Sequence, residues 1–326
     1  AEWFVRRAHE VGAARTLQGL HTSQGGRHQG LAGMLRRVFG GQDLARGGFY
    51  ERLRRRRPPL KPGDPLGNEH DARALTELVY PSGDAPDEVD GPPFRFSGPA
   101  HRHAVVERLL RSLADRRPLI VWLDDLHWSD DGVGLIDHLL QIDDPVPVVF
   151  VGTLRSDILS ARPALAERFD QLADRSDVER LEVTPLSRAD HRRLVDSLLD
   201  LEPRLVDTLV DRTEGNPLFA RQLIGHWVEA GQIEAGPEGF RVPDGSRTAL
   251  PADIDELWLE RVDRFLEAFP PGHAGEVMEA LELAAALGRE VDRREWEAVV
   301  AEDDRSIPAE FIDELVERGL ATRSEE

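Results

Sequence analysis

The segment Pro118–Asp125, PLIVWLDD, constrains the fold of this chain more than any other stretch. Five apolar residues in succession follow its proline, without the alternation of polar and apolar residues that marks a strand with one wet face. Such a run is typical of a strand covered on both faces, as in parallel sheets with helices packed on them. The run stops abruptly at two aspartates, Asp124 and Asp125.

Strand-like and helix-like segments alternate on both sides of this run as far as about residue 186. Strands are predicted at 13–20, 118–124, 146–153 and 177–184, and amphipathic helical segments separate them. Alternation of this kind favours an α/β fold with a parallel sheet and helices on both faces. From Ser187 the strands disappear and helical periodicity continues. We therefore expect an α/β domain at 1–186, a small helical domain at 187–240 and a mainly helical domain at 250–326.

Composition excludes several classes of protein. The chain has no cysteine, so it can form neither disulfides nor a cysteine-based metal site. Its net charge of −20 disfavours non-specific binding to nucleic acid or to anionic membranes. Residues 251–326 alone hold 22 acidic residues against 8 arginines, which opposes contacts with phosphates. The apolar runs are too short to span a bilayer and no signal-peptide pattern is present, so we expect a cytoplasmic protein.

The two aspartates have a chemical interpretation and a structural one. In nucleotide-hydrolysing α/β domains a buried strand carries an acid to the carboxyl edge of the sheet, where it holds the magnesium of Mg–ATP, usually through water. A second acid beside it orients the attacking water. On this interpretation Asp124 binds magnesium and Asp125 is catalytic. The alternative is that an aspartate at a strand end simply starts a turn, and the run alone does not decide between the two.

The surrounding motifs resemble those of the signal-transduction ATPases with numerous domains, an AAA-like class. RPLIVWLDDLHWSD (117–130) resembles their Walker B region, whose DDLxWAD pattern recurs here with Ser129 in the alanine place. VPVVFVGTLRSD resembles their fourth strand with a polar sensor, here Arg155. RTEGNPLFARQLI resembles their Gly-x-Pro motif, whose proline, here Pro217, packs near the adenine. LPADIDELWLERVDRF resembles the start of their winged-helix domain. The likeness is greatest to large bacterial transcriptional regulators and to ATPase modules fused to bacterial serine/threonine kinases.

The resemblance implies an AAA-like ATPase core, a helical lid and a truncated winged-helix domain that together act as an ATP-dependent conformational switch. It implies ATP and magnesium as cofactors, with Asp125 and Arg155 catalytic and with Asp124 and Pro217 in cofactor binding. A kinase or DNA-binding module upstream and repeat or sensor domains downstream are the implied partners. This segment itself carries no kinase motif, neither H-R-D-x-x-x-x-N nor D-F-G.

One part of the family pattern is missing. No G-x-x-x-x-G-K-[ST] phosphate-binding loop occurs, and the only lysine, Lys61, has no glycine loop before it. We expect the loop and its strand to precede Ala1, in which case this chain binds ATP weakly or not at all. In the family that strand lies between the strands predicted at 146–153 and 177–184, so both would lose backbone hydrogen-bond partners. A degenerate, non-hydrolysing scaffold is the alternative.

Several candidate residues also have purely structural interpretations. Pro217, preceded by Asn216, is a good helix start whether or not a nucleotide is near. Arg155 taken alone is a surface arginine. His127 and Trp128 are expected to pack the turn after the strand rather than to contact substrate.

Overall fold

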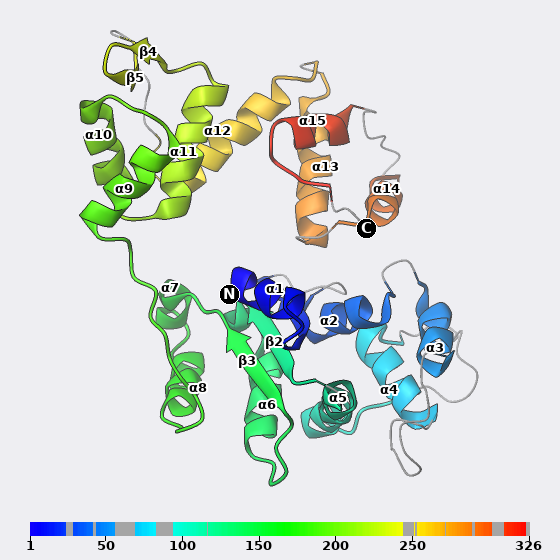
Figure 1. The fold of residues 1–326 in the computed structure, drawn as a ribbon. Helices are drawn as coiled ribbons and strands as arrows, with labels where there is room; N and C mark the ends of the chain where they lie inside the picture. Colours follow the sequence, from blue (N-terminus) through cyan, green and yellow to red (C-terminus); the bar gives the residue numbers. More distant parts are fainter. Residues whose placement is uncertain are drawn as a thin grey trace. The chain divides into compact units, whose positions relative to one another are not determined.

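A computed structural model of the chain shows two compact units (Figure 1). One unit comprises Ala1–Glu179 and Ala284–Arg293, and the other comprises Arg180–Leu283 and Arg294–Glu326. The structure describes residues 1–23, 29–41, 44–55, 69–82, 94–115, 117–243, 251, 253–270, 272–288, 291–301 and 310–323; Lys61 lies outside these ranges. None of the helices in the described ranges is both long and apolar enough to cross a membrane.

Three parallel strands form the sheet of the first unit, which confirms the predicted α/β class. β2 (Leu119–Asp124) lies in the middle, between β1 (Arg15–Leu20) and β3 (Val148–Gly152). This central position explains the uninterrupted apolar run of β2, because neighbours flank both its edges and side chains on both its faces are buried. Its carboxyl end, at Asp124, is level with Leu20 on β1.

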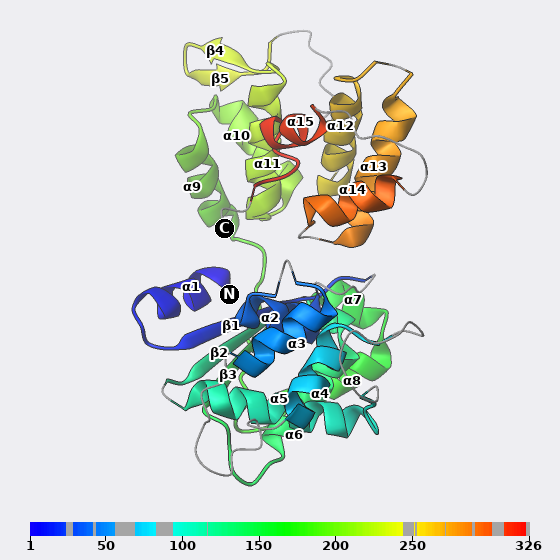
Figure 2. The same cartoon turned by 90° about the vertical axis from the view of Figure 1, so that its right-hand side faces the viewer.

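The order of the strands decides where the helices lie. The chain steps from β1 to β2 to β3 in one direction, so right-handed crossovers place the intervening helices on one face of the sheet. Figure 2 shows them gathered there. They are α2 (Gly30–Phe39), α3 (Arg46–Arg55), α4 (Glu69–Val79), α5 (Pro99–Ala114) and α6 (Asp130–Leu140), and α8 (Pro163–Ala173) joins the same core. The sheet contributes Leu119, Val121 and Leu123 to that core.

The opposite face of the sheet is covered by α1 (Glu2–Glu10). Its Val5 packs with Ile120 and Trp122 of β2 in a small separate cluster. The cover is partial, since Val149 on β3 is 55% exposed. The prediction of a strand at 146–153 is confirmed, but, in contrast to β2, none of the residues of β3 is buried. β3 is an edge strand, paired with β2 alone among the described residues.

The predicted strand at 177–184 is wrong. This stretch forms no strand and runs as irregular chain between α8 and the second unit (Figure 1). Leu181 and Val183, the apolar residues that would have been buried, are 78% and 95% exposed. A strand exists only where a neighbour takes up its backbone hydrogen bonds, and no described strand lies beside this segment. Its sequence is suited to a strand, but the partner is missing from the described sheet.

The second unit is mainly helical from Ser187 onward, as predicted. α9 (Arg188–Leu198), α10 (Pro203–Thr213) and α11 (Pro217–Glu229) bury one apolar core, and Leu257 of α12 (Ile254–Leu266) completes it. The largest side chain in this core is the fully buried Trp227. The hydroxyl of Ser187 accepts a hydrogen bond from the backbone of Asp190 and so caps α9 at the residue where the strand periodicity ends.

The predicted helical domain at 187–240 ends in a small hairpin, which was not predicted from the sequence. β4 (Glu234–Gly236) pairs antiparallel with β5 (Gly239–Arg241). The two strands flank a Gly-Pro-Glu-Gly turn, in which Gly239 takes a φ of +124 that side-chain-bearing residues rarely adopt. The backbone of Phe240 exchanges hydrogen bonds with Asp200 and Glu202, which attaches the hairpin to the loop before α10.

The last helices are α13 (Ala274–Leu287), α14 (Arg293–Ala301) and α15 (Phe311–Glu317). An aromatic cluster joins α12, α14 and α15, with Phe265 and Trp296 each about 5 Å from Phe311, ring centroid to ring centroid. Arg261 on α12 links this cluster to α11, because its guanidinium donates to Gln222 at 2.8 Å and to the backbone carbonyl of Arg318 at 2.8 Å. Both predicted helical domains therefore contribute to one compact unit.

Candidate functional site

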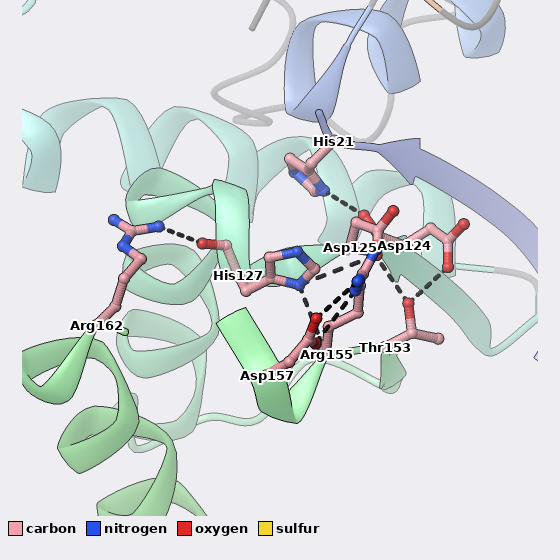
Figure 3. A network of polar contacts seen from close by, with 8 residues as sticks. All are labelled: His21, Asp124, Asp125, His127, Thr153, Arg155, Asp157 and Arg162. Atoms are coloured by element: carbon pink, nitrogen blue, oxygen red, sulfur yellow. Dashed lines mark hydrogen bonds and ion pairs between the residues drawn. The ribbon is translucent and has the colours of Figure 1, made fainter. Parts of the chain in front are cut away.

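The end of the middle strand carries Asp124, as predicted, and a neighbouring hydroxyl fixes its carboxylate (Figure 3). The hydroxyl of Thr153, just beyond the end of β3, donates to Asp124 Oδ1 at 2.5 Å. The same oxygen accepts the backbone N–H of Asp125 at 2.9 Å. One threonine thus holds both aspartates, and its own N–H donates to Leu123 O at 3.0 Å. Neighbouring parallel strands end at one edge, so residues 28 or 29 positions apart meet there.

Asp125 occupies a different environment from Asp124. Its backbone is left-handed, with φ 52 and ψ 42, and it begins a short 3-10 helix, Leu126–Trp128. A non-glycine residue in this conformation is uncommon and is often found at functional turns. Its side chain is 45% exposed. The chain therefore turns sharply at the sheet edge and leaves the Asp125 carboxylate accessible while Asp124 remains half-buried.

His21 follows β1 and links its end to the end of β2. Its Nδ1–H donates to the backbone carbonyl of Asp124 at 2.8 Å, which leaves Nε2 without a proton in the neutral ring. Nε2 is buried and has no hydrogen-bond partner among the described residues. Burial lowers the pKa of His21, despite its backbone hydrogen bond to Asp124 and the two nearby carboxylates, which act in the opposite direction. The ring is therefore neutral at pH 7.

His127, which is fully buried, packs against the turn after Asp125. Arg162, at the start of α8, donates to the His127 carbonyl and lies over the ring of Trp128, with 6.0 Å from its guanidinium carbon to the ring centroid. Burial lowers the pKa of His127 as well. The expectation that His127 and Trp128 pack the turn is confirmed.

Arg155 lies close to the two aspartates but turns its guanidinium toward another acid. It donates to both carboxylate oxygens of Asp157, at 3.2 and 2.6 Å, in a largely exposed pair on α7 (Ser156–Ser160). This pair lowers the pKa of Asp157. The backbone N–H of Arg155 donates to His127 Nδ1 at 3.4 Å. Thr153, two residues earlier and just beyond β3, donates its hydroxyl to Asp124.

Pro217 lies in the second unit, at the first position of α11. The side chain of Asn216 caps this helix by accepting the backbone N–H groups of Leu218 and Phe219 at 3.0 and 3.1 Å. The two residues before the cap, Glu214 and Gly215, are both left-handed, with φ 47 and φ 81. The structural interpretation of this motif is confirmed, and a role for Pro217 in nucleotide binding stays a prediction.

The acidic edge of the sheet suits a magnesium ion that arrives with phosphates. Mg²⁺ keeps several of its waters and is usually held by one or two carboxylates together with substrate oxygens. Asp124 and Asp125 offer that number of carboxylates, and Thr153 orients the carboxylate of Asp124 while it holds the backbone of Asp125. Within the described ranges no cluster of three or more His, Asp or Glu side chains could hold a metal by itself. The donor set thus fits a water-rich ion shared with a ligand.

Thr153 and His21 are the two residues of this site that sequence reasoning missed. In the structure each directly follows a strand, Thr153 after β3 and His21 after β1, as the first polar group beyond it. Arg155 was chosen from the sequence because of its charge. The register of the strands, however, decides which side chain contacts the end of the neighbouring strand. For His21 the partner is a backbone carbonyl of β2, and no sequence motif encodes a contact of that kind.

Replacing Thr153 with valine is expected to lower the free energy of unfolding by about 1–3 kcal/mol, because the backbone N–H of Asp125 and a carboxylate oxygen of Asp124 lose their partner. Valine keeps the shape and the preference for strand-like backbone. Thr208→Val on α10 is the matched control, since its hydroxyl bonds only to the helical carbonyl of Arg204. Urea unfolding measures both variants. Equal, small changes would show that Thr153 does not hold the two aspartates.

Comparisons with known proteins assign no family. No protein-family model matches the chain, and no solved structure matches it. Over 227 residues it is 26% identical to an uncharacterised protein of Rhizobium meliloti (strain 1021). The match covers 68% of this chain and 20% of that protein, so the chain spans about a fifth of its relative's length.

Proposed function

We propose that this chain is the ATPase module of a bacterial signalling or transcription-regulatory protein, of the class of signal-transduction ATPases with numerous domains. It works as a cytoplasmic conformational switch driven by Mg–ATP. The observation that supports this most strongly is the carboxyl end of β2, where a strand buried on both faces delivers Asp124 to the sheet edge and Thr153 fixes it.

The geometry of this edge suits phosphoryl chemistry. Ligands of open parallel sheets bind outside the carboxyl ends of the strands, where Asp124, Asp125 and Thr153 meet. The half-buried Asp124 would hold the magnesium that accompanies ATP. The more exposed Asp125 orients the attacking water, and Arg155 stabilises charge on the phosphates after leaving Asp157. ATP with magnesium supplies the group that is transferred, and the chain supplies position and charge.

The sheet is open where such a module needs its phosphate-binding loop. β3 presents an edge with no strand partner among the described residues, and the strand-like segment 177–184 is exposed and belongs to no strand of the described sheet. We propose that a strand carrying the phosphate-binding loop completes the sheet between them. One added parallel strand would form backbone hydrogen bonds with β3 on one side and with 177–184 on the other. It would thus supply the strand neighbour that each of these segments needs.

The second unit supplies the moving part in this proposal. α9 to α11 act as a lid whose Pro217 approaches the adenine, and α12 to α15 are the helices of a winged-helix domain. Residues 251–326, with 22 acids against 8 arginines, favour packing between domains over contact with nucleic acid. The output belongs to a kinase or DNA-binding module upstream, and repeat or sensor domains follow downstream.

Asp125→Asn tests the proposal in a longer chain that carries a phosphate-binding loop. We expect ATP turnover to fall about 100-fold or more, because the amide cannot orient water as the carboxylate does, while the Kd for Mg–ATP changes less than about threefold. Single-turnover hydrolysis and calorimetry measure the two quantities. Asp143→Asn, on the exposed turn before β3, is the matched control and should change neither. Unchanged turnover in the Asp125 variant would remove this residue from the catalytic role.

A non-hydrolysing scaffold is the second candidate, and one observation favours it. The 326 residues contain no G-x-x-x-x-G-K-[ST] loop. A scaffold would bind no nucleotide even in the longer chain, and the calorimetric arm of the same experiment separates it from a switch.

A further inference from the structure

The first residues of the second unit, 180–186, which we call the linker, end in a specific contact with the turn before α11. The linker is exposed along its length, and its last residue donates a backbone N–H, from Leu186, to the carbonyl of Gly215 at 2.9 Å. The two segments are so close that a Cβ on Gly215 would lie 2.6 Å from the oxygen of Leu186 and 2.9 Å from Cβ of Pro185. The turn before α11 therefore contacts the linker closely at Pro185 and Leu186.

His191 on α9 holds this turn from inside. Its ring is fully buried, and its Nδ1 accepts the backbone N–H of Gly215 at 3.1 Å. Its Nε2 lies 3.2 Å from the hydroxyl of Thr213, which already donates to Leu209 O at 2.8 Å. The hydroxyl must therefore accept from Nε2–H. These partners together require one form of the ring, the neutral tautomer with its proton on Nε2.

We propose that His191 is a proton-sensitive clamp that fixes Pro185 and Leu186, at the end of the linker, to the turn before α11. In the neutral ring Nδ1 accepts from Gly215 and the turn keeps its grip on Leu186. In the imidazolium Nδ1 carries a proton, faces the N–H of Gly215 as a second donor and loses the hydrogen bond. Release frees the turn and lengthens the free linker by the two residues it held. This clamp does not depend on the nucleotide chemistry proposed above.

The surroundings of His191 set the pH range of the clamp. Burial lowers its pKa, with no contribution from any charged neighbour. The ionisable side chains that flank it on α9, α10 and the turn are Arg188, Asp190, Arg192, Asp207, Asp211 and Glu214, and four of them pair with each other across α9 and α10. Because the pKa is lower with the clamp closed than with it open, closure is complete above the ordinary imidazole pKa of about 6.5 and weakens as pH falls below it.

Amide hydrogen exchange on the full chain tests the clamp, after correction for the intrinsic pH dependence of exchange. Protection of the Leu186 and Gly215 amides is expected to fall about tenfold per pH unit below pH ~6.5, until the lowered pKa is reached. The amides of Val210 and Leu223, in the core of the same unit, serve as an internal reference and should keep their protection. Parallel loss at those two sites would mean unfolding of the whole unit and would overturn the proposal.

His191→Gln separates the clamp from a simple packing role. Glutamine presents an acceptor and a donor at the spacing of the two ring nitrogens but does not titrate, so it should retain protection of Gly215 and abolish its pH dependence. His191→Ala should lose protection at every pH. His226→Gln is the control, because His226 is buried in the same unit with its pKa lowered to about 4, and its ring contacts Arg264 and Glu260 of α12. A pH dependence that survives in His191→Gln, or that disappears in His226→Gln, would contradict the assignment.

Discussion

Mg–ATP is expected to bind the 326-residue chain about a thousandfold or more weakly than a longer chain that carries a phosphate-binding loop on a strand beside β3. The two acids proposed to hold magnesium lie at the end of the middle strand, but no described residue forms a nest of backbone amides or brings a lysine to the triphosphate. Asp124 and Asp125 are negative, as ATP is, so without that nest the edge repels the nucleotide. A single bridge through magnesium does not replace several charge-assisted hydrogen bonds of about 1.5–3 kcal/mol each.

Isothermal titration of both chains with Mg–ATP measures this difference, and hydrolysis by the shorter chain should be absent. Asp124→Ala in the shorter chain is a useful companion, since removing a carboxylate from an edge that repels ATP should not weaken binding further. Micromolar affinity in the 326-residue chain would contradict the expectation. It would show that the nucleotide is held by groups other than a loop at the edge of β3.

Gly215→Ala is expected to lower the free energy of unfolding of the second unit by about 2–4 kcal/mol. The residue has a φ of +81, which disfavours any side chain, and the new Cβ would meet the backbone oxygen of Leu186 at 2.6 Å. This oxygen cannot rotate away from the new Cβ, because it belongs to the backbone of a segment that the turn holds. The clamp at His191 should open in the same variant, since the backbone of residue 215 has to move.

Gly225→Ala, on α11 of the same unit, is the matched control. Nothing lies within 4 Å of the position its Cβ would take, and alanine is favoured over glycine inside a helix. We expect this variant to be more stable by about 0.5–1 kcal/mol. Urea unfolding of both variants, followed by circular dichroism, gives the comparison. If the two substitutions had the same effect, the left-handed turn would not be the feature that joins the linker to the second unit.

Local features of this molecule could be predicted from the sequence. The apolar run Leu119–Leu123 predicted a buried strand with Asp124 at its carboxyl end, and this is where the structure places it. The loss of strand periodicity after Ser187 predicted the helical unit, and Asn216 with Pro217 predicted the start of α11. Each of these rests on residues within about ten positions of one another, since the period of side chains and the capping of helix ends are properties of short segments.

Only the tertiary structure decided how these segments serve each other. The segments 146–153 and 177–184 have similar strand-like sequences, yet the first forms an edge strand and the second joins no strand of the described sheet, because a strand requires a neighbour for its backbone hydrogen bonds. Thr153 reaches Asp124, and His191 reaches Gly215, through register and packing between distant positions. Sequence alone determined which segments can be strands and helices and which acid ends the middle strand. The partners of those groups depend on contacts between residues far apart in the chain, which no local pattern encodes.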